Sequence, residues 1–258
     1  MGILNVTPDS FSDGGTYLEP ERAVRRGQEM ESEGADFIDI GGESSRPGSD
    51  PLSVEEELRR VLPVIQQLSK KVSIPLSVDT YKSNVAKAAI EAGAELVNDI
   101  SGLTADTEMA QIAAIHDACV ILMHMKGTPK TMQHDPTYGD VVQEVGEFLE
   151  QQAVVARRNG IHSIILDPGI GFGKTIDHNL EILKHLQQFK RFGFPILVGP
   201  SRKAFIGKLL DARVEDRLEG TIAAVTSSIL RGANIVRVHD VKQVKRAAIV
   251  ADALKSDS

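Results

Sequence analysis

Polar residues and glycines follow almost every apolar run of this 258-residue sequence. Asp and Asn side chains accept hydrogen bonds, Lys and Arg donate them, and His does either, so together they suit a ligand with polar edges or high charge. No Ser–His–acid or Cys–His arrangement can be placed, and the single cysteine, Cys119, lies inside an apolar run. The residues that follow the runs are Asn5, Gly41-Gly42-Glu43, Asp79, Asn98-Asp99, His124, Asp167, Gly199-Pro200-Ser201 and Arg237-Val238-His239.

The apolar runs alternate with stretches whose charges recur at helical spacing. Continuous apolar runs separated by helices indicate parallel strands buried on both faces. Eight such units favour an α/β fold with one closed (β/α)8 TIM barrel, in a single domain over residues 1–258, rather than an open doubly wound sheet. The expected strands are 2–6, 37–40, 76–78, 96–97, 119–123, 164–166, 196–198 and 235–238, and the expected helices are 20–33, 53–71, 82–92, 108–116, 138–159, 177–188, 213–231 and 241–254.

In such a barrel the active site lies at the C-terminal ends of the strands, so the polar residues are expected to share one rim. A single Asp or Asn at a strand end is ordinarily a turn former, whereas a whole ring of them is not. Unusually long loops follow the first and second strands, over 5–16 and 41–51, and they carry Phe11 and Arg46 among small polar residues. We expect these loops to close over a substrate.

The glycine-rich stretch 167–175 resembles a phosphate-binding loop, but Pro168 stands where such a loop needs glycine. Its glycines are instead expected to let the backbone approach a flat ligand. His124 either lines the pocket or belongs to a turn, and the sequence leaves both open.

Composition excludes several classes of function. The net charge is −7, tryptophan is absent and aromatic residues make up 4%, which argues against nucleic-acid binding. No stretch approaches the length of a membrane span, and the start of the sequence lacks the basic region of a signal peptide. The lone cysteine fits a reducing compartment, so we expect a cytoplasmic protein.

Five motifs occur in order along the chain, and together they resemble the dihydropteroate synthase family of pterin-binding enzymes. The resemblance covers essentially the whole chain. It implies a transferase of folate biosynthesis that condenses (7,8-dihydropterin-6-yl)methyl pyrophosphate with p-aminobenzoate, giving 7,8-dihydropteroate and pyrophosphate. It also implies Mg2+ as cofactor, a homodimer, with 221–230 as one candidate contact, and inhibition by sulfonamides. The motifs are 5–15 (NVTPDSFSDGG), 39–48 (DIGGESSRPG), 167–174 (DPGIGFGK), 201–203 (SRK) and 237–240 (RVHD).

The resemblance also implies roles for individual residues. The pterin edge would be held by acceptors and by one lysine, its ring by apolar walls, the pyrophosphate by donors and cations, and Mg2+ by the carbonyl oxygen of Asn5, with Asp13. No strong general base is needed, because an aniline nitrogen is already neutral at pH 7. The implied pterin residues are Asp79, Asn98, Asp167, Lys203, Ile100, Met123 and Phe172; those for pyrophosphate are Ser45, Arg237 and His239; those for p-aminobenzoate are Phe11, Pro47 and Lys203; and those closest to the chemistry are Lys203, Asp167, Asp13 and Arg46.

The sequence departs from the family at three places. Ser45 replaces a more usual threonine, and Ala204 stands where many relatives carry serine. Relatives also commonly carry a short segment before the first motif. We therefore expect either a less completely plugged barrel floor, with reduced stability rather than lost chemistry, or a true start upstream of Met1. Two other kinds of pterin-binding protein remain as alternatives. A pterin-dependent methyltransferase barrel is disfavoured by residues 201–203 and the first loop, and a non-catalytic pterin binder is disfavoured by the intact motifs. A Schiff-base aldolase would need a strand-end lysine, for which Lys203 lies too far beyond its strand.

Overall fold

The computed structural model describes residues 1–7, 19–46 and 48–255. The predicted site residues Phe11, Asp13 and Pro47 lie outside these residues, so their predicted roles remain predictions.

Parallel strands form a closed ring, which confirms the predicted TIM barrel. Six strands pair in sequence order, and the seventh pairs with the eighth. Two further parallel bridges, Leu166 with Ile196 and Gly2 with Val238, join the pair to both edges of the larger sheet. The strands are β1 (Gly2–Asn5), β2 (Ile38–Gly41), β3 (Leu76–Asp79), β4 (Leu96–Asp99), β5 (Cys119–Met123), β6 (Ile164–Asp167), β7 (Leu197–Val198) and β8 (Ile235–Val236).

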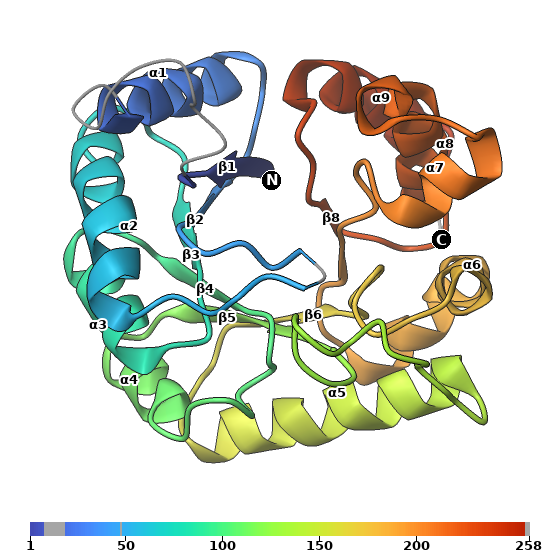
Figure 1. Cartoon of the computed structure of the whole chain (residues 1–258), viewed down its shortest axis with the longest axis horizontal. Helices are drawn as coiled ribbons and strands as arrows, with labels where there is room; N and C mark the ends of the chain where they lie inside the picture. Colours follow the sequence, from blue (N-terminus) through green and yellow to red (C-terminus); the bar gives the residue numbers. More distant parts are fainter. Residues whose placement is uncertain (8–18, 47, 256–258) are drawn as a thin grey trace.

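Helices surround this ring of strands (Figure 1). The sequence explains their starts: the Ser53 side chain accepts from the Glu56 backbone N–H at 3.2 Å, and acidic residues fill the first turn that follows. The described helices are α1 (Glu19–Ser32), α2 (Val54–Leu68), α3 (Ser83–Glu91), α4 (Met109–Ile115), α5 (Val141–Arg158), α6 (Ile176–Lys184), α7 (Ala204–Leu210), α8 (Leu218–Leu230) and α9 (Val241–Ala253), with 3-10 turns at Leu186–Phe192 and Val214–Asp216.

Two helix predictions were wrong. Helix α7, which directly follows the motif 201–203, was not predicted. The helix expected over 213–231 begins only at Leu218, after the 3-10 turn Val214–Asp216. Arg217 explains the interruption: its guanidinium donates to the carbonyl oxygens of Ala212 at 3.1 Å and Arg202 at 3.0 Å, which ties the chain back across α7.

Alternation along the strands divides the barrel interior into two levels. Successive side chains point to opposite faces of a strand, so every second residue faces inward. The lower level is an apolar cluster that fills the barrel, made of Met1, Leu96, Ile121, Ile165 and Leu197. Two residues further along β4 and β6, the inward side chains are the polar Asn98 and Asp167, and this upper level holds the candidate site.

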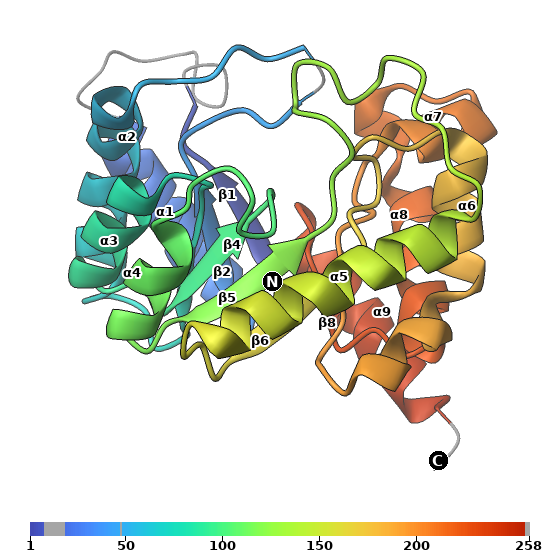
Figure 2. The ribbon, with the colours of Figure 1, turned by 90° about the horizontal axis from the view of Figure 1, so that it is seen from below.

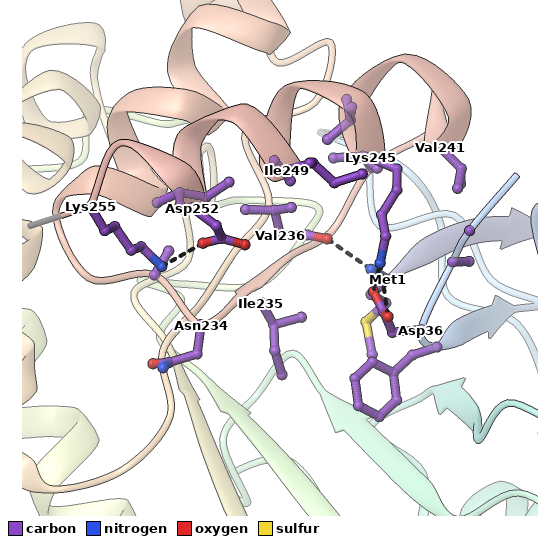
Figure 3. Close-up of a pocket in the computed structure, with 18 residues that line it drawn as sticks. Met1, Asp36, Asn234, Ile235, Val236, Val241, Lys245, Ile249, Asp252 and Lys255 are labelled. Carbon is purple, nitrogen blue, oxygen red and sulfur yellow. Dashed lines mark hydrogen bonds and ion pairs between the residues drawn. The ribbon is translucent and has the colours of Figure 1, made fainter. Parts of the chain in front are cut away.

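A cavity of about 380 Å³ lies at the floor of the barrel (Figure 3). It lies between β8, α9 and the start of β2, and Lys245 and Asp36 form an ion pair at 2.9 Å on its edge. This cavity is at the end of the barrel opposite to the polar level. In the described part of the chain, no helix has both the length and the apolarity that a membrane crossing requires.

Candidate active site

Four buried side chains rich in acceptor oxygens converge inside the barrel; we call Asp39, Asp79, Asn98 and Asp167 the acceptor group. They come from β2, β3, β4 and β6, and their exposed fractions are 0% for Asp39, 12% for the Asp79 side chain, 3% for Asn98 and 5% for Asp167. Strand register brings them together, because Asp79 lies directly opposite Asn98 and Met123 opposite Asp167. The predicted Asp79, Asn98 and Asp167 therefore do share one site, together with Asp39.

Arg237 binds two members of the acceptor group. Its Nε donates to Asp39 Oδ2 and its Nη2 to Asp79 Oδ2, both at 2.6 Å. Burial opposes the charge of Arg237, but these carboxylates outweigh it and raise the pKa of the guanidinium. Burial raises the pKa of Asp79 to about 7, against the lowering effect of Arg237. The two carboxylates thus orient Arg237. Its Nη1 makes no described hydrogen bond to the acceptor group.

Asp39 also fixes the amide of Asn98. The Asn98 Nδ2 donates to Asp39 Oδ2 at 2.9 Å, so Asn98 presents its Oδ1 as an acceptor. That Oδ1 and Asp39 Oδ1 are both buried without a hydrogen-bond partner among the described residues. Because unsatisfied buried acceptors are costly, this arrangement is typical of a site that receives donors from a ligand.

Asp167 lies where β6 meets the glycine-rich turn. Its Oδ1 accepts from the Gly169 backbone N–H at 2.7 Å, and burial raises its pKa to about 6. A Cβ on Gly169 would lie 1.9 Å from the His124 carbonyl oxygen, and one on Gly173 would lie 2.4 Å from that of Lys126. Gly169 and Gly173 therefore let this turn pack against the segment after β5, and the expected approach of the glycine backbone to a flat ligand stays a prediction.

An apolar wall borders the acceptor group. It consists of Ile100, Met123, Met132 and Phe172, all buried, with Tyr81 and Met125 packed against it. The predicted Ile100, Met123 and Phe172 therefore lie together, and Met132, which was not predicted, lies with them. Lys203 lies over the Phe172 ring, with Nζ 4.1 Å from the centroid. Burial, with Arg237 nearby, lowers the pKa of Lys203 to about 8.

Lys174 and His124 form a buried polar pair behind the wall. Lys174 Nζ lies 2.9 Å from His124 Nδ1 and donates to the carbonyl oxygen of Phe172 at 3.0 Å. Burial, and then the charge of Lys174, lowers the pKa of His124 to about 2, so its ring is neutral. Lys174, which resembles the lysine of a phosphate-binding loop, thus holds the glycine-rich turn together with His124.

His239 is held beside Ser201. The Ser201 Oγ accepts from the His239 backbone N–H at 3.2 Å and lies 3.0 Å from His239 Nδ1. Burial, followed by the charge of Arg237, lowers the pKa of His239 to about 4. A neutral ring that accepts at Nδ1 from the serine hydroxyl carries its proton on Nε2. His239 therefore offers a neutral N–H donor rather than a positive charge.

The loop residues are less tightly placed. Arg46 is exposed, and the hydrogen bonds described for it involve its backbone, with Ser44 and Ser49. Ser45 is half-buried, and Asn5 ends β1 opposite Gly41, which in turn lies opposite Asp79. Asn5 therefore shares the level of the acceptor group, whereas the Arg46 side chain lies outside the buried site.

Residues 1–239 match the family described as "Pterin binding enzyme". The dihydropteroate synthase of Synechocystis sp. is 50% identical over 257 residues, covering 98% of this chain and 89% of its own. The chain belongs to the dihydropteroate synthases of the pterin-binding enzyme family.

Solved dihydropteroate synthases have the same fold. The Yersinia pestis enzyme, solved as a sulfonamide drug complex, superposes with a TM-score of 0.93 at 44% identity, over 98% of this chain and 92% of its own. The Xanthomonas albilineans enzyme, solved with 4-aminobenzoic acid, also gives a TM-score of 0.93, at 45% identity and with the same two coverages. The shared fold therefore includes the strands that carry the acceptor group.

Proposed function

We propose that this protein condenses (7,8-dihydropterin-6-yl)methyl pyrophosphate with p-aminobenzoate to give 7,8-dihydropteroate and pyrophosphate. The observation that carries the proposal is the acceptor group beside the apolar wall. A pterin is a flat ring with several N–H donors on one edge, so it needs both features at once. We further propose that residues 1–258 act as a single pterin-binding domain in the cytoplasm.

The pterin edge would donate to Asp167, Asp79 and the Oδ1 of Asn98. Lys203, 4.1 Å above the Phe172 ring, would donate to the ring carbonyl or a ring nitrogen. The apolar wall would contact the ring. In this arrangement the protein supplies orientation, and the buried acceptors regain the partners that water would otherwise provide.

The pyrophosphate would lie where Arg237, His239 and Ser45 meet. Arg237 supplies positive charge that two carboxylates already orient, and His239 supplies a neutral donor. Asn5 offers an amide oxygen, a ligand type that Mg2+ accepts, and the small Gly41 beside it leaves room. Among the described residues, no group of three or more His, Cys, Asp or Glu could hold a metal ion. When bound, Mg2+ would neutralise charge on the leaving group.

The bond from the pterin methyl carbon to the pyrophosphate oxygen would break first, with its electron pair leaving on pyrophosphate. The arylamine nitrogen would then attack the resulting pterin-methyl cation and lose one proton. Phe11, Pro47 and Lys203 would form the p-aminobenzoate pocket, Arg46 would close over it with the second loop, and Asp13 would join Asn5 at Mg2+. Because aniline nitrogen is neutral at pH 7, none of these residues must act as a strong base. Sulfonamides would compete for the same pocket.

We also propose a homodimer. In α8, the residues Thr221, Val225 and Ile229 are buried against the rest of the chain, whereas Leu230 is 47% exposed. On the neighbouring α9, Ile249 and Val250 are each 60% exposed. A pair formed through these exposed side chains would bury them. Sedimentation measurements on the wild type and on Val250→Asp test this, since the variant should shift towards monomer.

The experiment for the catalytic proposal measures pyrophosphate release from the pterin substrate, with p-aminobenzoate present or omitted and Mg2+ present or chelated. Metal-dependent release that yields dihydropteroate only with p-aminobenzoate is expected. Binding of the pterin substrate without any product under these conditions would instead support a non-catalytic pterin binder.

A further inference from the structure

Glu43, the second residue after β2, has three buried or half-buried hydrogen-bond partners. Its Oε1 accepts from the Tyr81 hydroxyl at 2.6 Å, and its Oε2 accepts from the Leu52 backbone N–H at 2.8 Å and from Lys82 Nζ at 2.5 Å. The Glu43 side chain is only 10% exposed. Because Glu43 and Leu52 flank the second loop, one carboxylate ties both ends of that loop together.

The contacts at the tip of the loop are weaker anchors. Asp50 pairs with Lys130 at 2.7 Å, but the two side chains are 79% and 63% exposed. Exposed pairs of this kind contribute little, because water and salt screen them. Figure 2 shows this loop and the segment after β5 side by side at the same rim. The Gly48 N–H also donates to the Pro129 carbonyl oxygen at 3.1 Å, so the tip is held by one backbone bond and an exposed pair, and the base by the nearly buried Glu43.

Tyr81 connects this base to the apolar wall, since its ring packs against the wall while its hydroxyl donates to Glu43. Lys82 adds a second connection, because its Nζ also lies 2.5 Å from Glu57 of α2, which is 1% exposed. Burial acts to lower the pKa of Lys82, but the bonds to Glu43 and Glu57 outweigh it, so the ammonium stays charged. The loop base is thus joined to both the wall and the helix layer.

We propose that Glu43 and Tyr81 are positioning residues that set the second loop, with Ser45 and Arg46, against the wall that holds the pterin ring. The proposal rests on the proposed function, since it concerns how the loop meets the second substrate. Neither side chain touches the reacting atoms. Their effect is expected on p-aminobenzoate use, while the pocket for the pterin ring stays formed by the acceptor group and the wall.

Tyr81→Phe is the sharpest test, because it keeps the ring in the wall and removes only the hydroxyl. We expect the KM for p-aminobenzoate to rise about three- to tenfold, the range that loss of one hydrogen bond produces. The dissociation constant of 6-hydroxymethylpterin, which lacks pyrophosphate, should stay within about twofold of wild type. Glu43→Gln should show the same split at least as strongly. Asp50→Asn, which removes an exposed contact of the same loop, is the matched control and should leave both values unchanged.

The outcomes separate the two proposals. A wild-type protein that makes no dihydropteroate overturns the proposed function and this inference with it. An active wild type with an unchanged KM in Tyr81→Phe, whatever its melting temperature, overturns the positioning role alone. An equal loss of affinity for 6-hydroxymethylpterin also overturns it, because Tyr81 would then act only as part of the ring pocket.

Discussion

Replacing Asp167 by asparagine is expected to stabilise the protein while it strongly weakens pterin binding. Asparagine keeps an Oδ1 that accepts from the Gly169 N–H, so the turn after β6 is retained. It removes a carboxyl whose pKa burial raises from 3.8 to about 6. Because the folded-state pKa is above the unfolded one, the ionised carboxyl costs folding free energy. This cost is full above about pH 6 and fades as pH falls towards about pH 4.

The magnitude follows from the two pKa values, whose difference corresponds to about 3 kcal/mol. That difference already includes the favourable charges of Lys203 and Arg237, which lower the pKa of Asp167, and we expect a gain of about 1–3 kcal/mol at about pH 7.5. For a chain of this length that raises Tm by about 2–10 °C. Pterin affinity should fall about 100-fold, since an amide N–H2 would face the N–H donors of the ring.

Thermal unfolding of wild type and Asp167→Asn at about pH 7.5 and about pH 5 measures the effect, and titration with 6-hydroxymethylpterin measures binding. About half of the stability difference should remain at the lower pH. A variant less stable than wild type at about pH 7.5, or an equal difference at both pH values, would refute the reasoning about the buried carboxyl.

Three further substitutions test other parts of the site. Asp39→Asn should lower kcat/KM about 10- to 100-fold by releasing a charged hydrogen bond to Arg237, and steady-state kinetics within twofold of wild type would contradict this. Gly169→Ala should lower the free energy of unfolding by about 3 kcal/mol or more, because its φ is +70° and its Cβ would collide with the His124 carbonyl; an unchanged urea midpoint would be incompatible with that packing. Lys174→Met should destabilise more at about pH 9 than at about pH 6, because burial lowers the pKa of Lys174 from 10.5 to about 7, so the wild type gains stability as pH rises between these values. Equal losses in urea unfolding at both pH values would argue against a lowered pKa for Lys174.

The rim of the barrel was predictable because β-strand alternation is local. Asp79, Asn98 and Asp167 each end an apolar run, and parallel strands bring such ends together. Asp39 was missed because only residues at or just past the end of each run were considered. It lies two positions before the end of β2, and the same alternation turns it inward.

Other features depend on contacts between distant segments. Lys174 meets His124, 50 residues earlier in the chain, and no local pattern reveals that the lysine serves packing rather than phosphate binding. Asp99 was grouped with the rim residues, yet it faces away from the interior and accepts from the backbone N–H groups of Ser101 and Leu103, each at 2.8 Å. Adjacent strand residues point to opposite faces, which explains why Asn98 belongs to the site and Asp99 does not.

The most direct test of the account follows the arylamine nitrogen. Wild-type protein would be incubated with the pterin pyrophosphate, Mg2+ and p-aminobenzoate carrying a heavy-nitrogen label on its amine, and the products would be separated and weighed by mass spectrometry. We predict labelled 7,8-dihydropteroate in an amount equal to the pyrophosphate released. Release of pyrophosphate with the label remaining in p-aminobenzoate, or no release at all, would contradict the proposed condensation.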